Sequence, residues 1–142
     1  MQRKAAGVVD RPRMGEALRE RALDDVCVLI VDDNVDGLEV LRGFLEYHGA
    51  FVRAGLSARS ALEMLEHVTP DLIITDLAMP GMSGARLLTK IRKRVSGVAI
   101  PVVALTAYPE TYARSAARFD AYLTKPLEPK TFFRVVAPLI GR

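Results

Sequence analysis

Hydrophobic residues along the chain follow two alternating patterns, and the alternation is repeated five times. Short apolar runs such as Val26–Val31 and Leu72–Ile74 are continuous, which is typical of strands covered by helices on both faces. The stretch at 50–55 is a weaker strand. The predicted strands lie at 26–33, 50–55, 71–76, 100–107 and 121–126.

Between these runs the apolar residues recur at helical spacing. Asn34 or Asp36 is the expected N-cap of the first helix, Gly49 its stop, and Ser57 the N-cap of the second. The predicted helices lie at 34–49, 57–68, 84–95, 109–119 and 128–140. The core positions expected on three of them are Val35, Leu38, Leu41 and Leu45; Ala61, Leu62, Leu65 and Val68; and Phe132, Phe133, Val136 and Leu139.

Five strand-helix units predict an α/β fold with a doubly wound parallel sheet. Right-handed crossovers would place the first and fifth helices on one face and the other three on the opposite face. The chain of 142 residues is predicted to hold one domain, at 25–142. Residues 1–24 lack periodicity and are expected to be a flexible lead-in, with a short helix from about Glu16 to Leu23 as the alternative.

Composition excludes several classes of function. A single cysteine, Cys27, rules out an intrachain disulfide and is expected to be buried and inert, and two scattered histidines, His48 and His67, make a zinc site improbable. Both histidines are expected on helix surfaces or at helix ends. No apolar stretch reaches the roughly 18–20 residues of a membrane helix, and no secretory signal is recognisable, so a cytoplasmic protein is expected.

The net charge of +3 is mild, and its densest basic run lies at 86–94. A solvated helix surface explains this run better than a surface for nucleic acid or an acidic partner, although the second reading stays open.

Chemistry is expected where the strands end, because the carboxyl ends of parallel strands meet at one edge of the sheet. The residues at these ends are Asp32, Asp33, Asp76, Thr106 and Lys125. Each alone is compatible with an ordinary turn residue or a salt bridge. Together, three carboxylates would repel one another, which a hard divalent cation such as Mg²⁺ relieves. A carboxylate beside Mg²⁺ can attack phosphorus to form an acyl phosphate, with the amine and hydroxyl as partners of the phosphoryl oxygens.

The order and spacing of four motifs resemble the receiver domain of two-component response regulators. The motifs are "VDD" at 31–33, "DLIITDLAMPGMSG" at 71–84, "ALTA" at 104–107 and "YLTKP" at 122–126. The resemblance spans Val26 to Leu139. It implies a flavodoxin-like (β/α)5 fold with strand order 2-1-3-4-5.

The resemblance also implies a role for each site residue. Asp76 would be the phosphoacceptor. Mg²⁺, or Mn²⁺ in its place, would be bound by Asp33, Asp76 and the backbone carbonyl of Ala78, with Asp32 reaching the metal through water. Lys125 would contact the phosphoryl group.

Conformational features follow from the same resemblance. The peptide bond before Pro126 would be cis. Thr106 and Tyr122 would form a switch pair that responds to phosphorylation through the fourth helix and fifth strand. Ala78 and Tyr108 occupy positions that influence phosphoryl lifetime, and their side chains predict slow self-hydrolysis.

One residue departs from the family pattern. Arg118 stands before the fifth strand where glycine is common, so either it costs about 1 kcal/mol in a left-handed conformation or the fourth helix ends differently. Arg118→Gly is expected to raise stability if the strain exists.

The leading functional hypothesis is a signalling switch rather than a turnover enzyme. Its phosphodonor would be a histidine kinase or a histidine phosphotransfer protein, and it would be a stand-alone regulator or part of a hybrid kinase. Dimerisation stays open; the face of the fourth helix, fifth strand and last helix is the usual place for a homodimer in the family that the sequence resembles. No direct binding to nucleic acid or membrane is expected. The alternatives are a Mg²⁺-dependent phosphohydrolase, which would usually have a second acid at position 78, and an interaction module that is never phosphorylated.

Overall fold

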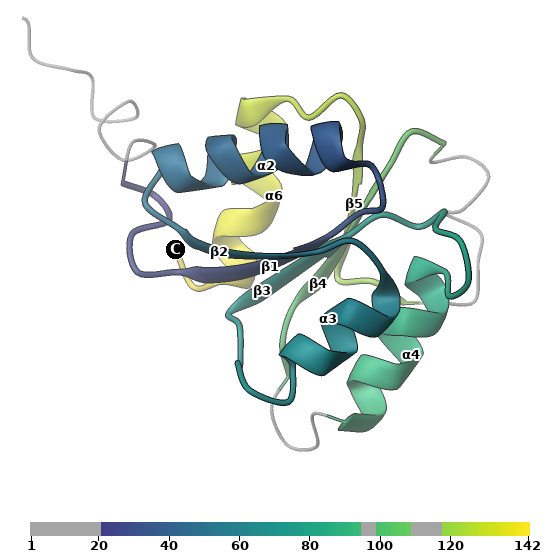
Figure 1. The fold of residues 1–142 in the computed structure, drawn as a ribbon. Helices are drawn as coiled ribbons and strands as arrows, with labels where there is room; N and C mark the ends of the chain where they lie inside the picture. The colour runs from purple at the N-terminus through teal and green to yellow at the C-terminus, as the bar shows by residue number, and fades with distance from the viewer. Residues whose placement is uncertain (1–20, 95–98, 109–117) are drawn as a thin grey trace, which may run out of the picture.

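A computed structural model describes residues 21–94, 99–108 and 118–142. Within these ranges, five parallel strands form one sheet in the order β2-β1-β3-β4-β5, which confirms the predicted fold class and strand order (Figure 1). The strands are β1 (Cys27–Val31), β2 (Phe51–Gly55), β3 (Leu72–Thr75), β4 (Val102–Thr106) and β5 (Ala121–Thr124).

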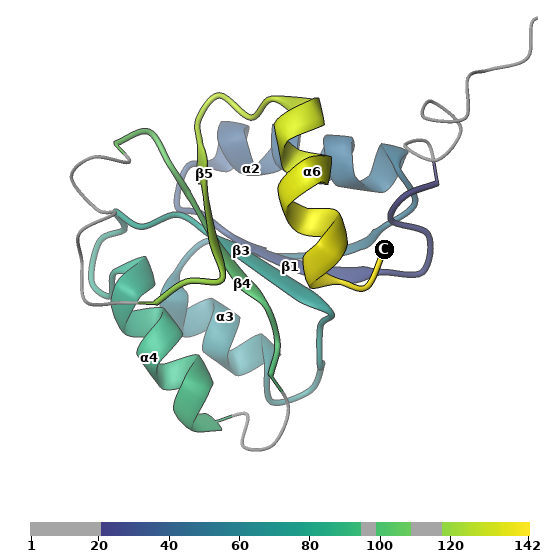
Figure 2. The ribbon, with the colours of Figure 1, turned by 180° about the vertical axis from the view of Figure 1, so that it is seen from behind.

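Helices cover both faces of the sheet (Figures 1 and 2). The helices α2 (Val35–Tyr47) and α6 (Pro129–Leu139) pack on one face, and α3 (Ala58–Met64) and α4 (Gly84–Arg94) pack on the other. These positions agree with the predicted crossovers. The helix predicted at 109–119 falls almost entirely outside the described residues. None of the described helices has the length and apolar character that crossing a bilayer requires.

The strand β1 shows why its sequence is continuously apolar. Val28 and Ile30 pack into the core under α2 and α6, whereas Leu29 and Val31 pack into the core under α3 and α4. Successive strand residues point to opposite faces, so a strand with helices on both sides needs an apolar residue at every position.

Two helices differ in detail from the prediction. Asn34, not Asp36, caps α2, because its side chain accepts a hydrogen bond from the backbone N–H of Gly37. Val35 is 54% exposed and not part of the core, since it lies in the first turn and Leu38 is the first residue of α2 that packs on the sheet. The helix α3 ends at Met64, four residues before the predicted end.

The chain enters the domain through a turn at 21–25 rather than through a helix that reaches Leu23. Leu23 is 1% exposed and packs in the core, and its N–H donates to the carbonyl of His48. The guanidinium of Arg142 donates to the carbonyl of Asp24 over 2.7 Å. Contacts that are distant in sequence therefore hold the turn at 21–25 against the sheet and α2.

The burial of His48 and of Cys27 differs from the expectation. His48 caps the C-terminus of α2, as expected of a helix end, but it is buried against the rings of Phe44 and Phe133. Cys27 is half-buried instead of fully buried. Burial and the nearby charge of Asp71 raise the pKa of the Cys27 thiol, which keeps it protonated at neutral pH.

Candidate functional site

The strand register brings the predicted site residues to one edge of the sheet. Val31 and Thr75 are paired residues of β1 and β3, so Asp32 and Asp76, which follow them, lie side by side. The backbone N–H of Asp76 donates to the carbonyl of Val31, which continues the ladder to the edge. On the other side, the N–H of Lys125 donates to the carbonyl of Thr106.

Three carboxylates and one amine meet at this edge. Oxygen atoms of Asp32, Asp33 and Asp76 all lie within 4.8 Å of one another. The Nζ atom of Lys125 lies 2.9 Å from Oδ2 of Asp32 and 3.6 Å from Oδ2 of Asp76. Four of the five residues predicted at strand ends are thus brought together from three strands, and the fifth, Thr106, lines the same pocket.

Backbone hydrogen bonds orient the two inner carboxylates. Oδ1 of Asp76 accepts from the N–H of Leu77 over 2.8 Å, and Oδ1 of Asp32 accepts from the N–H of Asn34 over 3.0 Å. Each carboxylate therefore directs its other oxygen, Oδ2, toward Lys125.

The pKa values of both Asp76 and Lys125 are raised in the site. Burial raises the pKa of Asp76; the charge of Lys125 opposes this rise, whereas the charge of Asp32 adds to it. Burial lowers the pKa of Lys125, but its hydrogen bond to Asp32 and the charge of Asp76 outweigh burial and raise it above the usual value. Negative charge is in excess at Asp76, so added positive charge would favour its ionised form.

The donor set fits Mg²⁺ or Mn²⁺. Hard divalent cations take oxygen ligands, and clustered carboxylates at the rim of an open pocket supply them. The pocket has a volume of about 360 Å³ and is lined by Asp32, Asp33, Asn34, Asp76, Ala78, Thr106, Ala107, Tyr108 and Lys125. Such a volume leaves room for a cation with a phosphoryl group.

The positions expected to control phosphoryl lifetime both line this pocket. Ala78 offers only a methyl group. Tyr108 is 65% exposed, and its backbone N–H donates to Oγ1 of Thr106 over 3.0 Å.

The predicted switch residues share one face of the sheet. Ala104 pairs with Tyr122 and Thr106 pairs with Thr124, so Thr106 and Tyr122 lie on the same face, two residues apart in register. Thr106 is 1% exposed, and Tyr122 is half-buried with its ring edge against Phe119. Arg118 is exposed and follows directly on residues outside the described ranges, so its effect on the helix predicted at 109–119 stays a prediction.

The peptide bond between Lys125 and Pro126 is cis, the geometry that the sequence resemblance implies.

Sequence reasoning missed two features of the site. The first is the close approach of Gly84 to Asp76. A Cβ atom at Gly84 would overlap the carbonyl oxygen of Asp76, and the N–H of Gly84 donates to the carbonyl of Leu77 over 2.9 Å. Glycine at the start of α4 lets the helix pack directly against the backbone of Asp76.

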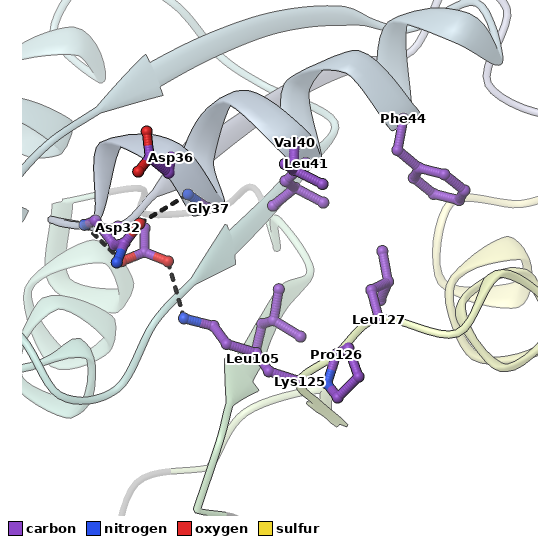
Figure 3. Close-up of a pocket in the computed structure, with 11 residues that line it drawn as sticks. Asp32, Asp36, Gly37, Val40, Leu41, Phe44, Leu105, Lys125, Pro126 and Leu127 are labelled. Atoms are coloured by element: carbon purple, nitrogen blue, oxygen red, sulfur yellow. Dashed lines mark hydrogen bonds and ion pairs between the residues drawn. The ribbon is translucent and has the colours of Figure 1, made fainter.

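The second missed feature is an apolar pocket of about 490 Å³ beside the carboxylates (Figure 3). Val40, Leu41 and Phe44 line it from α2, and Leu127 lines it from the segment after β5. Lys125 belongs to this pocket as well as to the carboxylate site. Only Val40 could have indicated this pocket from the sequence, because it is an apolar residue on the outer side of α2. In the structure it is 74% exposed.

Comparison with known proteins identifies relatives of this fold and sequence. Residues 28–137 match the response regulator receiver domain family. A protein of Leptolyngbya boryana, described as an uncharacterized 14.6 kDa protein in the sodA1 3′ region, is 40% identical over 119 residues, covering 82% of this chain and 91% of that protein. The sensor histidine kinase GacS of Pseudomonas protegens is 34% identical over 147 aligned positions, covering 98% of this chain but 16% of the kinase.

A solved structure shows the same architecture. The receiver domain of the sensor histidine kinase PA1611 from Pseudomonas aeruginosa PAO1, which has a magnesium ion coordinated in its active-site cleft, is similar with a TM-score of 0.76 at 26% identity. The similarity covers 83% of this chain and 99% of that domain. Sequence and structure thus agree, and the chain belongs to the response regulator receiver domain family.

Proposed function

We propose that this chain is a phosphorylation-controlled signalling switch in which Asp76 accepts a phosphoryl group. The observation that carries the proposal is the meeting of Asp76 with two further carboxylates and Lys125 at one pocket. The donor is the phosphohistidine of a histidine kinase or a histidine phosphotransfer protein. The chain takes part in one transfer at a time and is not a turnover enzyme.

In the transfer, a carboxylate oxygen of Asp76 forms a bond to phosphorus while the bond from phosphorus to the donor imidazole nitrogen breaks. The released imidazole takes up a proton. Mg²⁺ or Mn²⁺, bound by Asp33, Asp76 and the carbonyl of Ala78 with Asp32 acting through water, would supply positive charge to the phosphoryl oxygens. Lys125, held by Asp32 at 2.9 Å and close to Asp76, is positioned to pair with another phosphoryl oxygen.

The readout begins at Thr106. Thr106 lines the pocket and lies on the same sheet face as Tyr122, so movement of its hydroxyl toward the phosphoryl group would leave space for the ring. We assign these two residues as the switch that changes the face built from the helix predicted at 109–119, β5 and α6. The same face is the proposed site of homodimer formation.

The apolar pocket beside the site supports docking of the phosphodonor. It shares Lys125 with the carboxylate site, and Val35 and Val40 expose apolar surface on the neighbouring outer side of α2. A helical donor can bury apolar side chains there while it presents its histidine to Asp76. The proposed location is the cytoplasm.

The two alternatives find less support. A phosphohydrolase usually has a second acid two residues after its nucleophile, and Ala78 has no acidic group. A module that is never phosphorylated would not need the carboxylate cluster with Lys125 beside it.

The test is incubation of the purified chain with labelled acetyl phosphate and Mg²⁺. We expect one acid-stable, alkali-labile label per chain, lost in Asp76→Asn but kept in Asp36→Asn, a matched change on the exposed side of α2. Continuous release of phosphate would support the hydrolase, and absence of label would support the interaction module. Rapid loss of label from isolated phosphoprotein would contradict the assignment of Ala78 and Tyr108 to slow hydrolysis.

A further inference from the structure

The helix α4 is unusually basic for a surface helix. Its 11 residues include five Lys or Arg and no acidic residue. One of the five, Arg92, is used within the fold, where its guanidinium donates to the carbonyl of Ile100 and to Asp120, both over 2.7 Å. The other four are exposed, so most of this charge faces solvent.

Three of these exposed cations line a groove between α3 and α4, two helices that lie side by side (Figure 1). The groove has a volume of about 380 Å³, and we call it the basic groove. It is lined by Arg59, Leu62, Met82, Lys90, Lys93 and Arg94. Four cationic side chains thus surround two apolar ones, and no acidic side chain is among the lining residues.

The charges of the basic groove are largely unpaired within the described part of the chain. Arg94 forms an ion pair with Glu66 over 2.8 Å. No ion pair to a described residue involves Arg59, Lys90 or Lys93. A positive potential therefore extends from the groove into solvent and attracts acidic groups.

The shape of the groove decides among the acidic ligands. A bilayer surface would require protruding apolar side chains, whereas Leu62 and Met82 are half-buried in a hollow. A nucleic-acid duplex would be held by phosphate contacts and would gain little from an apolar floor. An acidic peptide with one apolar side can use both the cations and the floor.

We propose that the basic groove binds an acidic, amphipathic peptide segment of a partner protein. Carboxylates of the peptide pair with Arg59, Lys90 and Lys93, and its apolar side chains pack on Leu62 and Met82. The groove shares no residue with the pocket around Asp76, so this binding goes beyond phosphoryl transfer.

The experiment measures fluorescence anisotropy of the full chain with a labelled helical peptide of about 12 residues, close to the length of α4, that repeats two glutamates and two leucines. Lys90→Glu with Lys93→Glu is expected to weaken binding about tenfold or more, because two rim charges are reversed. The matched control, Lys130→Glu with Arg134→Glu on α6, makes the same change of net charge on two exposed residues and is expected to alter affinity less than about twofold.

Further probes test the peptide chemistry. A peptide with glutamine in place of glutamate and one with serine in place of leucine are each expected to bind about tenfold more weakly. Urea unfolding and labelling of Asp76 from acetyl phosphate verify that each variant is folded, and Lys90→Ala with Lys93→Ala replaces the reversal if that variant unfolds.

Three results would overturn the proposal. They are absence of peptide binding, equal loss of affinity in the groove and α6 variants, and binding only to a DNA duplex or to vesicles of anionic lipid. Because phosphoryl labelling is measured on the same samples, failure of peptide binding leaves the assignment of Asp76 untouched.

Discussion

Replacement of Asp76 by asparagine should stabilise the fold, although it removes the proposed phosphoacceptor. At an effective dielectric constant of about 20, attraction between Asp76 and Lys125 across 3.6 Å is about 4.6 kcal/mol. Repulsion from each of the other two carboxylates, across at most 4.8 Å, is at least about 3.5 kcal/mol. The repulsions together outweigh the attraction by about 2 kcal/mol.

Solvent reduces this difference, because Asp33 is exposed and water screens its share. We therefore expect Asp76→Asn to raise the free energy of unfolding by about 1–2 kcal/mol, or Tm by about 3–6 °C, at neutral pH and low salt without divalent cations. Urea and thermal unfolding followed by circular dichroism measure the effect. Asp36→Asn makes the same chemical change outside the cluster and should bring no gain.

The pH dependence gives the sharper check. The pKa of Asp76 in the fold lies above the ordinary aspartate value of 3.8, because burial outweighs the attraction of Lys125, so the folded state binds this proton more readily than the unfolded state. Stability from protonation is present below 3.8 and is lost as pH rises through the folded pKa. The advantage of the asparagine variant should therefore shrink as pH falls. A difference in the free energy of unfolding between variant and wild type that does not change with pH would refute the electrostatic reasoning. So would a variant less stable than the wild type at neutral pH.

Three other predictions concern stability. Gly84→Ala should cost about 3 kcal/mol because its Cβ meets backbone, whereas Gly43→Ala, with open space inside α2, should gain about 0.5–1 kcal/mol; equal effects in urea unfolding would contradict the packing at Gly84. Leu23→Ala should cost about 2–4 kcal/mol and exposed Arg21→Ala less than about 0.5 kcal/mol; a neutral Leu23→Ala would show that the entry turn is not part of the core. Glu128→Gln should lower Tm at pH 7, because hydrogen bonds from Thr131 lower the pKa of the Glu128 carboxylate that caps α6. The stability contributed by this charged cap is present above pH 4.5 and is lost as pH falls through the folded pKa. A Tm of the variant that stays below that of the wild type in acid would exclude the charge as the cause.

The sheet could be predicted from the sequence, because a strand buried on both faces must be apolar at every position. Strands β1, β3 and β4 are buried at nearly every position and are continuously apolar in sequence. The carboxylate cluster was predictable for a related reason. Parallel strands end at a common edge, so the pairing of β1 with β3 brings Asp32 and Asp76 together independently of the loop conformations.

Features that depend on packing between distant segments were not predictable in the same way. Leu23 precedes any periodic pattern, and its burial depends on contact with the end of α2 near His48. Val35 has the correct helical spacing but lies one turn before the helix reaches the sheet. The apolar pocket joins α2 to Leu127, more than 80 residues away in the chain, and no local pattern reports such a pairing.

The hydrogen bond from Arg142 to the carbonyl of Asp24 has a practical consequence for experiments. It brings the last residue of the sequence next to the entry turn, at the rim where β1 starts, whereas the acidic pocket lies at the rim where β1 finishes (Figures 1 and 2). A fluorophore or affinity handle joined at Arg142 would therefore sit a full strand length from Asp76. Signals from such a label would report on the whole domain without obstructing the proposed phosphodonor.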